Sequence, residues 1–358
     1  MSGSLPNWSR AGWRAASHLE DGQGPDMRFY PNKDLTGGWY ENGGYLKVSL
    51  TQGATASLLA YSALTWEAAA RAAGQWDVAT RNVAWVAAYL YKCHYEADTF
   101  VAQIGDMTTD DLSWSSADSA PQAGRLGTTA WRPVWKVTTA SNRGADVVSQ
   151  VSGWKSAESN TCDACKDVGL CRTPDGFMVL YKFGSAHYTA NMVLAVLASS
   201  PRPGEALKNA RPSVPASAKG ERQCWAWGQM SYLLGANPAN QAYVVGLNVL
   251  SGLASGVSVP TRPRHRGASC SGHNGRCSGP LDDTPNPLTG ALMGGPAWDD
   301  SFLDDRDYIG STVSIEYNAG FNGAMLALSA LERALTAASR SWHDFCANPA
   351  DGYDGGVG

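Results

Sequence analysis

The residues best suited to chemistry in this sequence are aromatic rings and carboxylates spread over glycine-rich segments. The 358-residue chain contains 14 Trp, 14 Tyr, 39 Gly and 32 Asp and Glu residues. It contains no glycine-rich nucleotide fingerprint, phosphate-binding loop, His-Glu-x-x-His or Gly-x-Ser-x-Gly segment. Rings beside carboxylates and amides suit sugars, which stack on rings and need many hydrogen-bond partners. Any single Trp, taken alone, is more often a core residue.

The cysteines offer a second kind of chemistry. Cys162, Cys165 and Cys171 lie close together, as in a metal knuckle, but no nearby His or fourth Cys completes the four ligands of zinc. Cys270 and Cys277 flank a Gly/Ser/Asn loop and are placed for a local disulfide. The total of eight cysteines fits the disulfides of a secreted protein, with idle thiols as the alternative. We therefore expect no metal and no cofactor.

Composition excludes two classes of partner. Lys and Arg total 28 against 32 Asp and Glu, a net charge of −4, so the chain lacks the basic footprint of a nucleic-acid binder. No apolar stretch reaches the roughly 18 residues that a membrane span needs. The start of the chain has no apolar signal segment. The compartment stays open between an intracellular protein, a mature form and an incomplete gene model.

Helical periodicity dominates the elements that must position these groups. Apolar residues at intervals of three and four predict amphipathic helices in four ranges: Leu59–Ala70, Ala79–Leu90, Ala190–Leu197 and Phe321–Leu335. A further helix is predicted to end at Gln229–Leu234, because Gly235 and Pro238 follow.

Strand and loop signals complete the prediction. The best strand signals are Val134–Thr138 and Phe177–Lys182, and they do not alternate with helices. Pro201–Lys219 has the composition of a linker or an exposed loop. The longest polar segment, Gly256–Ser311, is predicted to be loop that carries function. The fold class is therefore predicted to be all-α, in one domain over 1–358.

Several ordered motifs share one resemblance. The first is Leu35-Thr-Gly-Gly-Trp-Tyr-Glu-Asn-Gly-Gly-Tyr-Leu-Lys47. It resembles the Leu-Thr-Gly-Gly-Trp-Tyr-Asp-Ala-Gly-Asp motif of glycoside hydrolase family 9, the endo-β-1,4-glucanase (cellulase) family. Further matches follow in order: Ala102–Asp106 with Asp110 and Trp114, Tyr232–Pro238, Pro263–Ser269, Gly290–Pro296 and Tyr317–Phe321. The resemblance implies an (α/α)6 toroid and inverting endo-hydrolysis of β-1,4-glucan.

The first departure from the family is length. The matches run to about Trp154 and resume at about Asp175, where the family has several more helices. The sequence therefore predicts an internal deletion near 155–175. Loss of helices exposes the apolar faces of their neighbours. The chain is expected to close a smaller ring, leave an open arc, or represent a damaged gene model.

The second departure is chemical. An inverting glycosidase needs one carboxylate to deprotonate water and one carboxylic acid to protonate the leaving oxygen. By resemblance, the base position is Gly44 and the acid position is Thr312, and neither residue can do this work. Glu41 replaces the Asp that helps to hold the water.

Three rescues are conceivable from the residues nearby. In the first, Glu41 acts as base through its longer side chain. In the second, Asp110 or Asp111 lies near the site and supplies a carboxylate. Glu316 is one helical turn after Thr312, but the family also has an acidic residue there, so Glu316 is interpreted as structural.

The substrate-binding residues are better retained than the catalytic pair. By resemblance, the residues that line or flank the cleft are Trp39, Asp106, Trp114, His265, Arg266 and Tyr317. The expected partner is a polysaccharide or oligosaccharide of the β-1,4-glucan type. Three hypotheses follow: a hydrolase with altered catalytic groups, a non-catalytic carbohydrate-binding descendant, which we favour, and a truncated paralogue or gene-model fragment.

Overall fold

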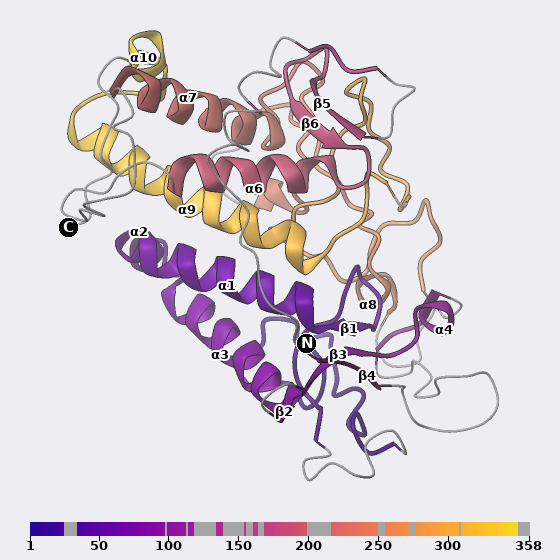
Figure 1. Ribbon diagram of the computed structural model, residues 1–358. Coiled ribbons are helices and arrows are strands. Elements are labelled where there is room, and N and C mark those ends of the chain that lie inside the picture. Colours follow the sequence, from indigo (N-terminus) through magenta and orange to yellow (C-terminus); the bar gives the residue numbers. More distant parts are fainter. Residues whose placement is uncertain are drawn as a thin grey trace.

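The computed structural model describes residues 1–24, 34–96, 99–111, 114–117, 134–138, 154, 160–163, 168–198, 216–249, 255–271, 277–307 and 309–349. Long helices lie side by side, and the short strands and irregular segments gather at one end of them (Figure 1). The longer elements are α1 (Ser49–Thr65), α3 (Trp76–Cys93), α6 (Ser185–Ala198), α7 (Ala216–Leu233) and α9 (Ile315–Ala337). The shorter ones are α2 (Glu67–Ala72), α4 (Met107–Asp111), α8 (Arg266–Ser269), α10 (Trp342–Ala347) and the 3-10 turn Leu247–Val249.

The helices pack as a row in the order α3, α1, α9, α6, α7 (Figure 1). The first residues of α1, α6 and α9 all lie at the end where the irregular segments gather (Figure 1). The central helix α9 approaches both neighbours closely because Gly320 faces Asn191 of α6 and Gly323 faces Ser62 of α1. A Cβ at either glycine would overlap these side chains.

The main apolar core lies between α6, α7 and α9. From α9 it receives the residues whose spacing predicted this helix: Phe321, Ala324, Leu328, Leu331 and Leu335. Residues from the irregular segments, including Tyr243, Leu292 and Trp298, extend this core toward the end of the helices where the loops lie.

The prediction of an all-α fold is only partly right, because the mainly helical chain also carries short antiparallel sheets. In the first sheet, β3 (Thr99–Ile104) pairs with β1 (Lys47–Val48), β2 (His94–Glu96) and β4 (Val134–Thr138). In the second, β5 (Val168–Arg172) pairs with β6 (Met178–Tyr181). Both predicted strands are confirmed, since Val134–Thr138 is β4 and Phe177–Lys182 contains β6. The other strands, β1, β2, β3 and β5, were not predicted from the sequence.

Most predicted helices are confirmed, with one correction. The range Leu59–Ala70 is not one helix, because α1 ends at Thr65 and α2 begins at Glu67. Trp66 between them leaves the helical region, with φ −120° and ψ 45°. The end of α7 is as predicted, and Gly235 after it has φ +103°. The predicted linker Pro201–Lys219 is wrong at its end, because α7 begins at Ala216; its earlier residues lie outside the described part.

Disulfides overturn the alternative of a metal knuckle. Cys162 is bonded to Cys171, which leaves neither thiolate for a metal, and Cys165 lies outside the described residues. The predicted bridge between Cys270 and Cys277 is present. A third disulfide joins Cys224 of α7 to Cys346 of α10. The described residues contain no group of three or more His, Cys, Asp or Glu side chains arranged to hold a metal.

The disulfide between α7 and α10 is expected to contribute more stability than the local bridge. Its cysteines are 122 residues apart, against 7 for Cys270 and Cys277. Because a longer closed loop removes more entropy from the unfolded chain, Cys224→Ala/Cys346→Ala should cost about 2 kcal/mol more than Cys270→Ala/Cys277→Ala. Urea unfolding of the two double variants measures the difference. Equal losses of stability in the two double variants would contradict the larger contribution expected for the disulfide between α7 and α10.

Candidate functional site

The segment Leu35–Leu46 carries two of the predicted catalytic positions and is anchored by a buried lysine. Lys47 is 0% exposed, and its Nζ lies 2.7 Å from Oδ2 of Asp21. The same ammonium donates to the carbonyl oxygens of Leu35, at 2.6 Å, and Gly37, at 3.1 Å. It also lies 4.6 Å from the centre of the Tyr89 ring of α3. One buried cation therefore fixes the start of the segment against the helices.

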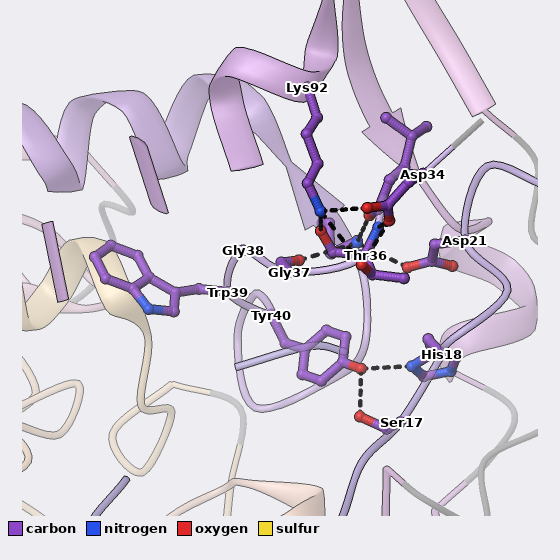
Figure 2. Close-up of polar contacts among 12 residues, drawn as sticks. Ser17, His18, Asp21, Asp34, Thr36, Gly37, Gly38, Trp39, Tyr40 and Lys92 are labelled. Carbon is purple, nitrogen blue, oxygen red and sulfur yellow. Dashed lines mark hydrogen bonds and ion pairs between the residues drawn. The ribbon is translucent and has the colours of Figure 1, made fainter. Parts of the chain in front are cut away.

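Polar contacts hold the same segment at two further points (Figure 2). The hydroxyl of Tyr40 lies 2.8 Å from Oγ of Ser17 and 2.5 Å from Nδ1 of His18. Lys92 of α3 donates to Oδ2 of Asp34 at 2.7 Å. These contacts fix the backbone of the segment from which the side chains of the site extend.

Trp39 lies in the core, although the sequence placed it among the cleft residues. Its ring is 6% exposed and packs with Ala56 and Val86, with Ile315 beside them. Figure 2 shows the rings of Trp39 and Tyr40 on opposite sides of the segment. Contact between Trp39 and a substrate stays a prediction, and its visible role is to pack the segment against α1, α3 and the start of α9.

Gly44, the predicted position of the missing base, has a carboxylate beside it from another element. A Cβ at position 44 would overlap Oδ2 of Asp110, a residue of α4. The backbone N–H of Tyr45 donates to both oxygens of Asp110, at 3.1 and 3.2 Å. Nη1 of Arg266 lies 3.1 Å from Oδ2 of the same carboxylate. The carboxylate of Asp110 therefore takes the space that a side chain at Gly44 would need.

An exposed ring and two guanidinium groups lie next to this carboxylate. Trp114 is 38% exposed, and its Nε1 donates to Oγ of Ser269 at 3.0 Å. The guanidinium carbons of Arg264 and Arg266 lie 5.4 and 5.8 Å from the centre of its ring. An exposed indole beside fixed hydrogen-bond donors is suited to stacking a sugar. Trp114 and Arg266 are thus brought together, as the sequence predicted.

His265 and Asp106 are hydrogen-bonded to backbone groups near Trp114 and Asp110. Nδ1 of His265 accepts from the backbone N–H of Ala268 at 3.0 Å and so caps α8. Burial, with a smaller effect of Arg14, lowers the pKa of His265 to about 3, so the imidazole is neutral. The carbonyl of Asp106 accepts from the backbone N–H of Asp110 at 2.9 Å. The side chain of Asp111 lies outside the described part.

Glu41 does not stand free to act as a base. Its carboxyl group is hydrogen-bonded to that of Glu316, the first-turn residue of α9, and accepts from the hydroxyl of Thr51. Burial and the charge of Glu316 raise the pKa of Glu41 to about 8. Glu316 also accepts from the hydroxyl of Ser314. Glu41 therefore keeps its proton near neutral pH, and Glu316, interpreted as structural, contacts a candidate catalytic residue directly.

Tyr317 follows Glu316 and is fixed by a partner that the sequence did not reveal. Its ring stacks on His187 of α6, with centroids 4.9 Å apart and planes at 16°. Nε2 of His187 lies 2.6 Å from Nδ2 of Asn191, and burial lowers the pKa of this histidine. Gly184, with φ +67°, lies against the Tyr317 hydroxyl, where a Cβ would overlap it. No spacing in the sequence distinguishes His187 from any other helical histidine.

Thr312, the predicted acid position, contacts the segment around Arg264. It is 4% exposed and forms a parallel bridge with Arg264, whose N–H donates to the carbonyl of Ser311 at 2.7 Å. Two residues further on, the N–H of Arg266 donates to the carbonyl of Gly43 at 2.9 Å. The segment around Arg264 therefore contacts both the backbone next to Thr312 and the backbone next to Gly44.

A row of helices with rings and carboxyl groups at the loop end defines a helical glycosidase-type fold. The Glycosyl hydrolase family 9 profile matches residues 1–157 and 149–325. The chain belongs to glycoside hydrolase family 9.

Solved endoglucanases share this fold. The endoglucanase of the termite Nasutitermes takasagoensis is 21% identical, with a TM-score of 0.71 covering 92% of this chain and 95% of that one. CelQ from Clostridium thermocellum, solved with cellobiose and cellotriose, is 20% identical with a TM-score of 0.66, covering 92% and 67%. The mainly helical prediction is thereby confirmed, and closure into a toroid stays a prediction.

Curated relatives are also endoglucanases. Endoglucanase 4 of Bacillus sp. (strain KSM-522) is 24% identical over 439 residues, covering 90% of this chain and 65% of that protein. Endoglucanase A of Bacillus pumilus is 24% identical, and the match covers 63% of it. The chain thus spans less than two thirds of these relatives. None of its described helices is long and apolar enough to cross a membrane.

Loss of the Lys47 ammonium is expected to destabilise the protein strongly. Lys47→Met leaves the carboxylate of Asp21 buried without its partner, which costs about 3–5 kcal/mol. Lys92→Met breaks a partly exposed ion pair with Asp34 and should cost under about 1 kcal/mol. Denaturant unfolding of both variants measures the difference, and similar losses would show that the buried pair is not the anchor.

The raised pKa of Glu41 predicts a pH dependence of stability. The folded state keeps the proton up to about pH 8, whereas the unfolded chain loses it near 4.5. Unfolding therefore releases a proton in this window, and the free energy of unfolding falls as pH rises, by up to about 1.4 kcal/mol per pH unit. Glu41→Gln should flatten this slope, while the exposed Glu67→Gln should leave it unchanged. A wild-type slope that survives Glu41→Gln would contradict the assignment.

Proposed function

We propose that this chain binds β-1,4-glucan chains at the site around Gly44, Trp114 and Thr312, and that its hydrolysis of cellulose is weak or lost. The observation that carries the proposal is the absence of an available acid at the position of Thr312. By family resemblance this position protonates the leaving oxygen. A threonine hydroxyl, here buried beside Arg264, does not give up a proton near neutral pH.

The nearby protonated carboxyl group does not substitute for the missing acid. Glu41 keeps its proton up to about pH 8, but the carboxyl group is 6% exposed. It is hydrogen-bonded to Glu316 and Thr51. General acid assistance is worth about 10²–10⁴ in rate, and the ether oxygen of cellulose is a poor leaving group without it. The rate on cellulose should therefore fall by at least this factor.

Sugar binding is supported by the groups that remain. Trp114 offers an exposed ring, and Arg264 and Arg266 hold their donors next to it. Related endoglucanases were solved with cellobiose or cellotriose bound. The predicted internal deletion near 155–175 belongs to the same proposal, because the two family matches meet at 149–157. A shortened domain keeps the loop end of the helices while it loses part of the helical wall.

Titration calorimetry with cellotetraose, beside an assay for reducing ends released from carboxymethyl cellulose, tests the proposal. We expect binding without appreciable release. Trp114→Ala should weaken binding about tenfold, or about 1.4 kcal/mol, because it removes a stacking surface. Trp76→Ala, at the far end of α3, is the matched control and should bind as the wild type does. Absence of binding, or release at the rate of an ordinary endoglucanase, would overturn the proposal.

The assignment of the acid position has its own test. Thr312→Glu places a carboxyl group where the family has one and should raise the release of reducing ends by about 10²-fold or more. Thr312→Gln introduces a side chain of the same size as glutamic acid but without an acidic proton, so it should leave the rate unchanged. A folded Thr312→Glu variant that binds cellotetraose but gains no activity would show that position 312 is not the acid position.

A further inference from the structure

The carboxylate of Asp110 lies beside Gly44, the predicted position of the missing base, and a backbone N–H and a guanidinium lie against it. It occupies the space of a side chain at Gly44, although it comes from α4. The Tyr45 N–H donates to it, and the Arg266 guanidinium lies 3.1 Å away. A donor N–H and an adjacent cation both favour an ionised carboxylate. Its side chain is 14% exposed, so it is not sealed from water.

The other carboxyl groups beside this segment are occupied. Glu41 is protonated up to about pH 8, so its carboxyl group is neutral below that pH and does not accept a further proton. Glu316 accepts from the hydroxyl of Ser314 and is hydrogen-bonded to the carboxyl group of Glu41. Asp110 differs because a backbone N–H and a guanidinium lie against it, and neither gives its proton away near neutral pH. Of the three carboxyl groups Glu41, Glu316 and Asp110, we therefore assign the role of proton acceptor to Asp110.

We propose that Asp110 is the general base of this site, replacing the carboxylate absent at Gly44, and that the site hydrolyses β-glycosides whose leaving group needs no proton. The inference rests on the proposed binding of β-1,4-glucan and adds a reaction to it. It also specifies the substrate class: cellobiosides with an activated leaving group, such as fluoride, rather than cellulose.

The step balances without an acid. Water attacks the anomeric carbon of β-cellobiosyl fluoride from the face opposite the fluoride, while Asp110 takes one proton from that water. The new C–O bond forms as the C–F bond breaks, and fluoride leaves with the bonding electron pair. The products are α-cellobiose, fluoride and protonated Asp110, which returns its proton to solvent. Configuration inverts, as expected when a base activates water on the opposite face.

Fluoride release from β-cellobiosyl fluoride tests the proposal directly. We expect the wild-type protein to release fluoride above the spontaneous rate, and Asp110→Asn to lower that rate by about 10²–10⁴-fold. Asparagine keeps the shape and the acceptor for the Tyr45 N–H but cannot take the proton. Asp77→Asn, on the exposed first turn of α3, is the matched control and should keep the wild-type rate.

A chemical rescue separates a base from a residue that only supports the fold. Asp110→Ala opens space beside Gly44, so azide should attack the anomeric carbon of β-cellobiosyl fluoride there and expel fluoride. The expected product is α-cellobiosyl azide, formed by Asp110→Ala and not by Asp77→Asn. A structural role for Asp110 would give no rescue.

Moving the carboxylate back to the segment provides a second variant. Gly44→Asp alone should lose activity, because the new side chain collides with Asp110. Gly44→Asp/Asp110→Gly removes the collision and should recover fluoride release relative to Asp110→Asn. Circular dichroism verifies folding.

The outcomes distinguish this inference from the proposed function. Cellotetraose binding without fluoride release by the wild type overturns the base assignment and leaves the binding proposal standing. Full activity of a folded Asp110→Asn variant also overturns it. Fluoride release that depends on Asp110 supports it even if cellotetraose does not bind.

Discussion

The buried ion pair between Lys47 and Asp21 is the constraint on which the site depends. A lysine ammonium removed from water needs a counter-charge and acceptors for its remaining N–H groups. Asp21 supplies the charge, and the carbonyls of Leu35 and Gly37 supply the acceptors. Because these acceptors are backbone atoms at the start of the segment, satisfying the lysine also fixes the course of the chain to Glu41 and Gly44. The predicted catalytic positions Glu41 and Gly44 therefore depend on a buried ion pair whose residues are not among the predicted site residues.

Two carboxyl groups at this site have opposite surroundings, and this contrast governs what the site can do. Glu41 faces another carboxyl group in a buried place, so burial and like charge favour its protonated form. Asp110 faces a guanidinium and a backbone N–H, so its charged form is favoured. A Cβ at position 44 would overlap Oδ2 of Asp110. The carboxylate beside Gly44 therefore comes from a different segment, α4, and a local comparison of sequences at Gly44 does not reveal it.

Local patterns predicted the elements whose stability is local. The apolar residues of α9 and α3 recur at helical spacing, and β4 and β6 show strand composition, so each was found from the sequence. The prediction failed where distant contacts decide. Trp66 interrupts a helical pattern, β1 pairs with the distant β3, and Cys162 is bonded to Cys171 instead of ligating a metal. The sequence around Trp39 is compatible with a ring that lines a cleft and with a ring in the core. Its packing against Val86 and Ala56 shows that it lies in the core.

The sequence by itself determined the family and the helical character, because motif order and apolar spacing are properties of residues along the chain. It also predicted that base and acid are missing at Gly44 and Thr312, and it named residues that lie near these positions: Glu41, Asp110, Trp114, Arg266 and Tyr317. Only the tertiary structure decided which of them touch. Whether a carboxyl group keeps or loses its proton depends on charges and burial a few ångströms away, and these come from segments far apart in the chain, such as α4 beside Gly44 and α9 beside Glu41.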